Sequence, residues 1–236
     1  ASVSDAFDRM VTATRGLSDS ASASSTATKA TGKPLSDSAS VNGTFQPVTG
    51  LGYILPAGWS TYSIPIAAQN NHVFASAETL GTASQDGLID ESKVDVVYKW
   101  NAVTQLWTQV LEGDDLAPTE VVVLKSNVSH VATLYFSTQL TNPPTQQLSV
   151  GWNLVGPAIP LNVGDMLVDQ ALISVYGTPS GLVGYVQVMS PTLNLEPWFW
   201  TRGQSGAPMV KRWQGYWVYM LNPGTLAGFS TTPVRP

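Results

Sequence analysis

The sequence matches itself at a constant offset of 93 residues, and this feature limits the fold more than any other. Gly58-Trp59 matches Gly151-Trp152, and Trp107-Thr108 matches Trp200-Thr201. Trp is rare in proteins, so the two matches indicate an internal duplication. The offset predicts two β-domains of about 95 residues, at 44–142 and 143–236, each the size of a small sandwich or barrel.

Positions that duplicated domains share are usually packing positions. We therefore expect four tryptophans to be mostly buried, as core residues at equivalent places in the two domains: Trp59, Trp107, Trp152 and Trp200. Truncation of any one to Ala is expected to cost on the order of 3–5 kcal/mol.

Short runs of β-branched and aromatic residues recur from Thr44 onward, bounded by Gly, Pro and Asn. Such runs are typical of β-strands. The clearest are 94–100, 121–124, 132–136 and 217–221. Only 74–80 and 164–173 offer a helical turn or two, so the sequence predicts an all-β fold class.

Residues 1–43 differ from the rest of the chain. More than half are Ser, Thr or Ala, and the segment repeats with a period of 18 residues. Apolar residues alternate with Ser, Thr or Asp, a pattern typical of an extended strand that has too few large apolar groups to fold alone. We expect an extended arm that binds a groove of another subunit through Val3, Phe7, Val11 and Leu17. A flexible linker is the other interpretation.

Charge and composition exclude several classes of function. The net charge is −5 and the 11 Lys and Arg residues are scattered, so no basic surface for nucleic acid is expected. No apolar run is long enough for a membrane-spanning helix. The absence of Cys excludes disulfides and Cys-bound zinc. Abundant Ser, Thr, Asn and Gln, and a first residue, Ala1, that is not Met, favour an extracellular or cell-surface location after signal-peptide removal.

Three motifs resemble those of a known family. They are a GWNL strand at 151–154, a W-x(n)-W hairpin from Trp100 to Trp107, and a GYW strand at 215–217. Their order is similar to that of a β-domain in secreted and S-layer-associated proteins of bacteria and archaea. The Ser-Asp-Ser-Ala-Ser repeat of the arm resembles tracts in surface and phage structural proteins. The resemblance implies aromatic packing motifs and brings no catalytic residue to this chain.

An enzymatic alternative comes from the loop at 203–208. It resembles the nucleophile loop of chymotrypsin-like proteases, with Ser205 as the nucleophile, and His72 and Asp95 precede it in the order of a triad. His72, however, lacks the small-residue strand that leads into a catalytic His, and Gly, Ser and Pro are ordinary turn residues. We therefore predict that the protein is not an enzyme and has no catalytic residue.

Candidate ligands for metals are sparse. His72 and His130 are the only histidines, and neither has the spacing of a zinc ligand. Two acidic stretches lack the spacing of a calcium loop: Asp86, Asp90 and Glu91, and Glu112, Asp114 and Asp115. We predict no metal and no cofactor. Asn42 and Asn127 begin sequons for glycosylation, which requires exposure during secretion.

A strand-patterned arm and two β-domains predict an extracellular structural subunit. It would form a filament or surface lattice by donating its arm to a neighbouring copy, so that its main partner is itself. One alternative is a carbohydrate-binding adhesin, with glycans held by Trp198, Trp213 or Trp217, which have no Trp counterpart in the first copy. A viral fibre or capsid-decorating protein and, more distantly, a serine protease are the others.

Overall fold

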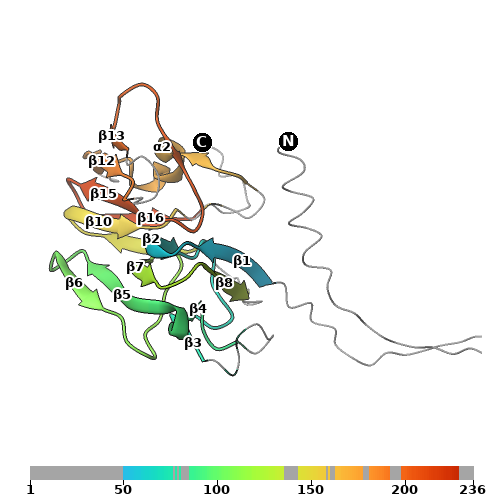
Figure 1. Ribbon diagram of the computed structural model, residues 1–236. Helices are drawn as coiled ribbons and strands as arrows, with labels where there is room; N and C mark the ends of the chain where they lie inside the picture. The colour runs from blue at the N-terminus through green and yellow to red at the C-terminus, as the bar shows by residue number, and fades with distance from the viewer. Residues whose placement is uncertain are drawn as a thin grey trace, which may run out of the picture. The chain divides into compact units, whose positions relative to one another are not determined.

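The computed structural model describes residues 50–76, 78, 80, 85–135, 143–157, 159, 163–177, 181–191 and 198–228. They form the strands β1 to β16 with one short α-helix and two 3-10 turns, so the predicted all-β fold class is confirmed (Figure 1). In the part of the chain that the structure describes, no helix is long and apolar enough to span a membrane.

The first half is built around a four-stranded antiparallel sheet in the order β2-β7-β5-β6. Its strands are β2 (Gly58–Ser63), β7 (Val121–Ser126), β5 (Val94–Asn101) and β6 (Leu106–Gln109). Two small sheets join it, one antiparallel and one parallel. They pair β1 (Gly50–Leu55) with β8 (His130–Tyr135), and β3 (Phe74–Ala75) with β4 (Ile89–Asp90), which the turn η2 (Glu91–Lys93) follows.

The second half uses the same plan. Its antiparallel sheet has the order β10-β15-β12-β13. The strands are β10 (Gly151–Val155), β15 (Tyr216–Met220), β12 (Tyr185–Met189) and β13 (Phe199–Thr201). The remaining elements are β9 (Thr145–Leu148) paired with β16 (Gly224–Ala227), β11 (Met166–Leu167) paired with β14 (Met209–Val210), α2 (Val168–Ala171) and η3 (Ile173–Val175).

The first strands of the two sheets begin at the predicted Gly-Trp motifs. Gly58 and Gly151 have φ angles of +93° and +95°, which L side chains rarely adopt, so each motif needs Gly for its backbone. In both halves the strand that begins at this Gly pairs with the last strand of the four in sequence, so the sheet orders match. This is the arrangement that a duplication produces; the duplication itself stays an interpretation.

Each half has its own hydrophobic cluster. One gathers residues between Leu55 and Leu134, and the other gathers residues between Leu148 and Leu226. The chain as a whole divides into the units Ala1–Phe45 and Gln46–Pro236, so both clusters belong to one compact unit. That the halves are separate domains, 44–142 and 143–236, stays a prediction.

The two halves exchange hydrogen bonds at matching positions. The backbone N–H of Ser63, at the end of β2, donates to the carbonyl of Trp213 at 3.0 Å, and that of Gly156, just after β10, donates to the carbonyl of Thr119 at 2.7 Å. Thr119 and Trp213 both have positive φ angles, 71° and 69°, shortly before β7 and β15. A reciprocal pair of contacts is the signature of a two-fold symmetric interface.

Matching residues also lie against one another at this interface. A Cβ on Gly156 would lie 1.7 Å from the Ser63 Oγ, and a Cβ on Gly215 would lie 2.3 Å from a Val121 methyl group. Self-contacts of equivalent positions occur only near a two-fold axis. Two side chains cannot share that space, and in both cases one member of the pair is Gly.

The four tryptophans predicted to be buried differ in exposure. Trp200 is 6% exposed and Trp152 is half-buried, whereas Trp59 and Trp107 are 38% and 47% exposed. Trp107 lies opposite Trp100, on the sheet face away from the core, while Trp200 lies opposite the core residue Val188. The core assignment is therefore wrong for Trp59 and Trp107, and the match of Trp107 with Trp200 does not mark equivalent places.

Candidate functional site: an aromatic cluster beside an open strand edge

An aromatic cluster lies where the two halves meet. It consists of Trp100 and Trp107 from the first half and Trp152, Trp217 and Tyr219 from the second. The closest ring centroids are 5.1 to 5.7 Å apart, and all contacts in the cluster are edge-to-face, with interplanar angles between 67° and 86°. This is the preferred geometry for aromatic pairs, and it fixes the orientation of each ring.

Strand register explains why these rings meet. Trp100 and Trp107 are directly opposite on β5 and β6, and Trp152 and Tyr219 are directly opposite on β10 and β15. Trp217 lies two residues from Tyr219 and so shares its sheet face. Each set lies on the face away from its own core, so the cluster is formed by the packing of one outer sheet face against the other.

The tip of the β5–β6 hairpin is held against β10. The Nε1–H of Trp100 donates to the carbonyl of Trp152 at 2.9 Å. The side chain of Gln105 donates to the same carbonyl at 2.9 Å and accepts from the Trp152 N–H at 3.3 Å. Gln105 has a φ of 57°, a strained conformation for this residue type, and these bonds offset its cost. The side chain of Asn101 closes the turn by accepting from the N–H of Val103 and Thr104.

Strand β6 forms an open edge of the first sheet. Within the described residues it pairs only with β5, and all four of its residues are exposed. Leu106 is 63% exposed and Trp107 is 47% exposed, which is unusual for large apolar side chains on an edge strand.

The direction of the β6 backbone groups follows from one hydrogen bond. Val110 N–H donates to the carbonyl of Val97 at 2.9 Å, so this pair is hydrogen-bonded. In an antiparallel ladder hydrogen-bonded and non-hydrogen-bonded pairs alternate, so Gln109 and Trp107 occupy non-hydrogen-bonded positions. Their N–H and C=O groups therefore point away from β5, toward the open edge.

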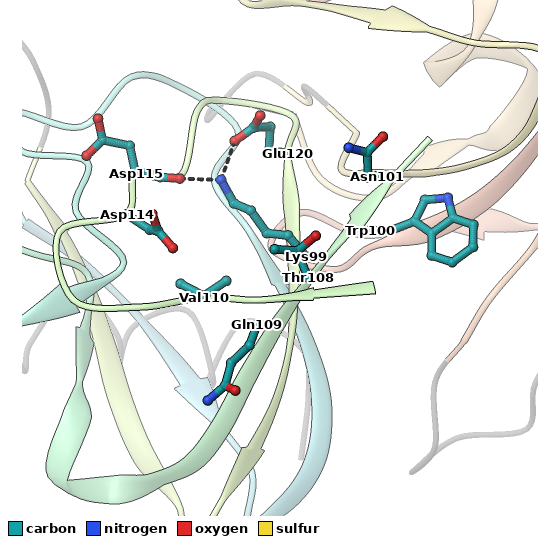
Figure 2. Close-up of a pocket in the computed structure, with 9 residues that line it drawn as sticks. All are labelled: Lys99, Trp100, Asn101, Thr108, Gln109, Val110, Asp114, Asp115 and Glu120. Carbon is teal, nitrogen blue, oxygen red and sulfur yellow. Dashed lines mark hydrogen bonds and ion pairs between the residues drawn. The ribbon is translucent and has the colours of Figure 1, made fainter. Parts of the chain in front are cut away.

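A cleft of about 420 Å³ lies on the other face of this hairpin (Figure 2). Lys99 reaches across it to the Glu120 carboxylate at 2.9 Å and to the carbonyl of Asp115, while Trp100 points away. Glu120 also accepts from the Ala117 N–H at 2.9 Å, and Asp114 accepts from the Leu111 N–H at 2.7 Å. These charges hold the loop between β6 and β7, so the cleft is a poor candidate for a catalytic site.

The structure does not assemble the residues of the proposed protease triad. The Nδ1 of His72 is 2.7 Å from the Oδ1 of Asp115, and Asp95 pairs with Lys125 at 2.9 Å. The hydrogen bond from Lys125 holds the pKa of Asp95 below its usual value. Ser205 lies in an exposed loop after β13. The carboxylate predicted to orient His72 is therefore occupied elsewhere.

Several of the acidic residues considered for calcium have structural roles. Asp90 caps η2 by accepting from Ser92 and pairs with Lys93 at 2.9 Å. Asp86 accepts from the Ser76 N–H at 2.8 Å. In the described residues no group of three or more His, Asp or Glu side chains lies together as metal ligands would. His130 is buried on β8 with its Nδ1 3.2 Å from the carbonyl of Val128.

The three tryptophans proposed for glycans are all half-buried. Trp213 stacks with Tyr53 and Tyr62 in the core of the first half, and Trp198 stacks on Tyr216. Trp217 belongs to the aromatic cluster. Sequence reasoning missed Trp107, the most exposed Trp described, because its apparent match with Trp200 suggested a core role.

The remaining predicted sites are the two glycosylation sequons and the apolar residues of the arm. Asn127 is exposed in the turn between β7 and β8, where a glycan has access. Asn42 and the arm residues lie outside the described residues: Val3, Phe7, Val11 and Leu17.

Comparison with known proteins adds no relative: no family model, no curated protein and no solved structure matches this chain. The class that the structure itself defines is an all-β protein of two halves with matching sheet orders and an aromatic cluster where the halves meet. The likeness to secreted and S-layer-associated β-domains depends on the three sequence motifs alone.

Proposed function

We propose that this protein is an extracellular, non-enzymatic structural subunit, which assembles into a filament or surface lattice by donating a strand from residues 1–43 to a neighbouring copy. The observation that carries the proposal is the open edge of β6. A strand donor needs an acceptor edge, and main-chain hydrogen bonds to such an edge supply affinity that does not depend on sequence.

The two faces beside β6 suit a strand of alternating character. Trp107 and the aromatic cluster lie on one face, and Lys99 and the polar cleft lie on the other. Successive side chains of an added strand point to opposite faces. In the arm, apolar residues such as Val3 and Phe7 alternate with residues that are mostly Ser, Thr or Asp, so one set would contact rings while the other meets polar groups.

Deletion of residues 1–43 tests the donor. We expect the full chain to form particles that are large by light scattering and ordered by electron microscopy, and the deletion variant to stay monomeric. The variant should keep its β-type circular dichroism, because the hydrophobic clusters begin at Leu55. Undiminished assembly of the deletion variant would contradict strand donation.

The acceptor is tested by Gln109→Pro. This change removes an N–H that points to the open edge and leaves the β5–β6 ladder intact, so it should abolish assembly without unfolding the protein. Gln109→Ala keeps the N–H and serves as the matched control, for which assembly should be unchanged. Equal assembly of both variants would exclude β6 as the acceptor.

A further inference from the structure

Trp107 is fixed in orientation and yet remains 47% exposed. Its ring makes edge-to-face contacts with Trp100 at 5.2 Å, Trp217 at 5.7 Å and Tyr98 at 6.5 Å. These three contacts restrict rotation of the Trp107 side chain about its χ angles. A rigid ring with a solvent-facing surface is a ready platform for stacking, because binding costs it little conformational entropy.

Polar groups flank this platform on the same sheet face. Gln109 lies two residues along β6 and is exposed, and Tyr98 lies directly opposite it on β5. Period two places Trp107, Gln109 and Tyr98 on one face. An amide that can donate and accept, next to a phenol and an indole ring, is the pattern that binds a sugar through its hydroxyls and its C–H face.

The charges on this face neutralise each other. Two charged residues lie nearby: Lys125 on β7 and Asp95 on β5. Their side chains form an ion pair at 2.9 Å. A charged ligand would therefore meet no uncompensated partner there. A proline-rich peptide is also less suited, since it needs a groove between parallel rings, and the cluster rings are edge-to-face with only Trp107 more than a third exposed.

From these observations we infer that Trp107, Gln109 and Tyr98 form a binding site for a neutral saccharide, with a pyranose ring stacked on Trp107 and its hydroxyl groups bonded to Gln109 and Tyr98. Trp107 is also the ring beside which the proposed function places a donated strand, so saccharide binding and strand donation would compete at the β6 edge. A structural subunit with this site would bind glycans through the outer face of its first sheet.

The inference is tested by titrating the full chain with cellohexaose, chitohexaose and maltohexaose, at a protein concentration at which light scattering shows monomers. Binding is followed by tryptophan fluorescence and by calorimetry. We expect at least one of the three to bind with a millimolar or lower Kd. Trp107→Ala should weaken that binding by about tenfold or more, and Trp107→Phe by less. Gln109→Ala should weaken saccharide binding severalfold. Because Gln109 is exposed on an edge strand, this change should not unfold the protein, so weaker binding would report on the site itself.

Trp59→Ala is the matched control. Trp59 is also an exposed Trp on the outer face of the same sheet, but it lies opposite Lys125 and outside the cluster, so its loss should leave binding unchanged. Absence of binding by all three saccharides to the full chain would overturn the inference. So would binding that survives Trp107→Ala, or quenching by a polyproline peptide in place of the saccharides.

Discussion

The two ends of the interface between the halves share a backbone plan and differ in their side chains. At one end Trp152 lies opposite Tyr219, and its neighbour across the sheet is Trp217. At the matching end Trp59 lies opposite Lys125, and Val123 takes the place of Trp217. In the described residues no ring contacts Trp59. The Gly-Trp motif is therefore part of the shared frame, whereas the aromatic cluster is an addition at one end.

A second pair of matching places differs in the same way. Ile54 and Val131 lie opposite one another on β1 and β8, and they are 66% and 55% exposed. At the equivalent place on β9 and β16, Thr225 donates to the Gln147 side chain at 3.1 Å. Backbone register is preserved while the exposed side chains change from apolar to polar. The two halves thus differ in their outward-facing side chains.

The largest expected difference between the two ends is in stability. Trp152→Ala removes ring contacts to Trp217 and Tyr219, so we expect its cost to approach the lower end of ~3–5 kcal/mol. Trp59→Ala removes an exposed ring and should cost less than about 1 kcal/mol. Denaturant unfolding of both variants measures the difference. Equal losses would show that the cluster adds nothing to the interface.

The shared frame is tested at the two-fold contact. Gly156→Ala places a Cβ against Ser63 and should destabilise the protein by about 1–3 kcal/mol through overpacking. Gly164→Ala, where no atom lies within 4 Å of the added Cβ, is the matched control and should be close to neutral.

The double variant Ser63→Gly/Gly156→Ala exchanges the small and larger member of this pair. If the two positions are related by the pseudo-two-fold axis, the exchange should restore most of the lost stability, and the double-mutant cycle should show strong coupling. Additive losses would contradict the two-fold arrangement.

Sequence reasoning identified the β class and the Gly-Trp motifs because both depend on local properties. Gly58 and Gly151 are needed for their φ angles, whatever the rest of the fold does. The pairing of Trp107 with Trp200 failed because a fixed offset ignores hairpin length. In the structure Val97 pairs with Val110, and the equivalent core residue Val188 pairs with Trp200. Trp200 therefore takes the place of Val110.

The interface and the aromatic cluster were beyond reach of the sequence for a different reason. Their residues lie on the outer sheet faces, and only the packing of one half on the other decides which outer positions are covered. Trp213 shows this: the sequence made it a candidate for binding glycans at the surface, yet it stacks with Tyr62 at 6.2 Å in the core of the other half. One signal was available in the sequence. Trp100 and Trp107 flank the turn of a predicted hairpin, and residues directly opposite one another in a hairpin share one sheet face.

The smallest predicted effect concerns the free energy of unfolding at high pH and a buried tyrosine of the second half. Burial raises the pKa of Tyr185, on β12, from 10.0 to about 12, and its hydroxyl has no hydrogen-bond partner among the described residues. Since the folded pKa is above the unfolded one, this residue's contribution to stability is complete below pH 10 and is lost as the pH rises toward 12.

Tyr185→Phe should therefore reduce the loss of unfolding free energy over that range and change little at pH 7. The parent protein is measured beside it. Urea unfolding at several pH values measures both, and an unchanged alkaline loss in Tyr185→Phe would assign it to other groups, first among them the buried Tyr62 and Tyr216, whose pKa values burial also raises.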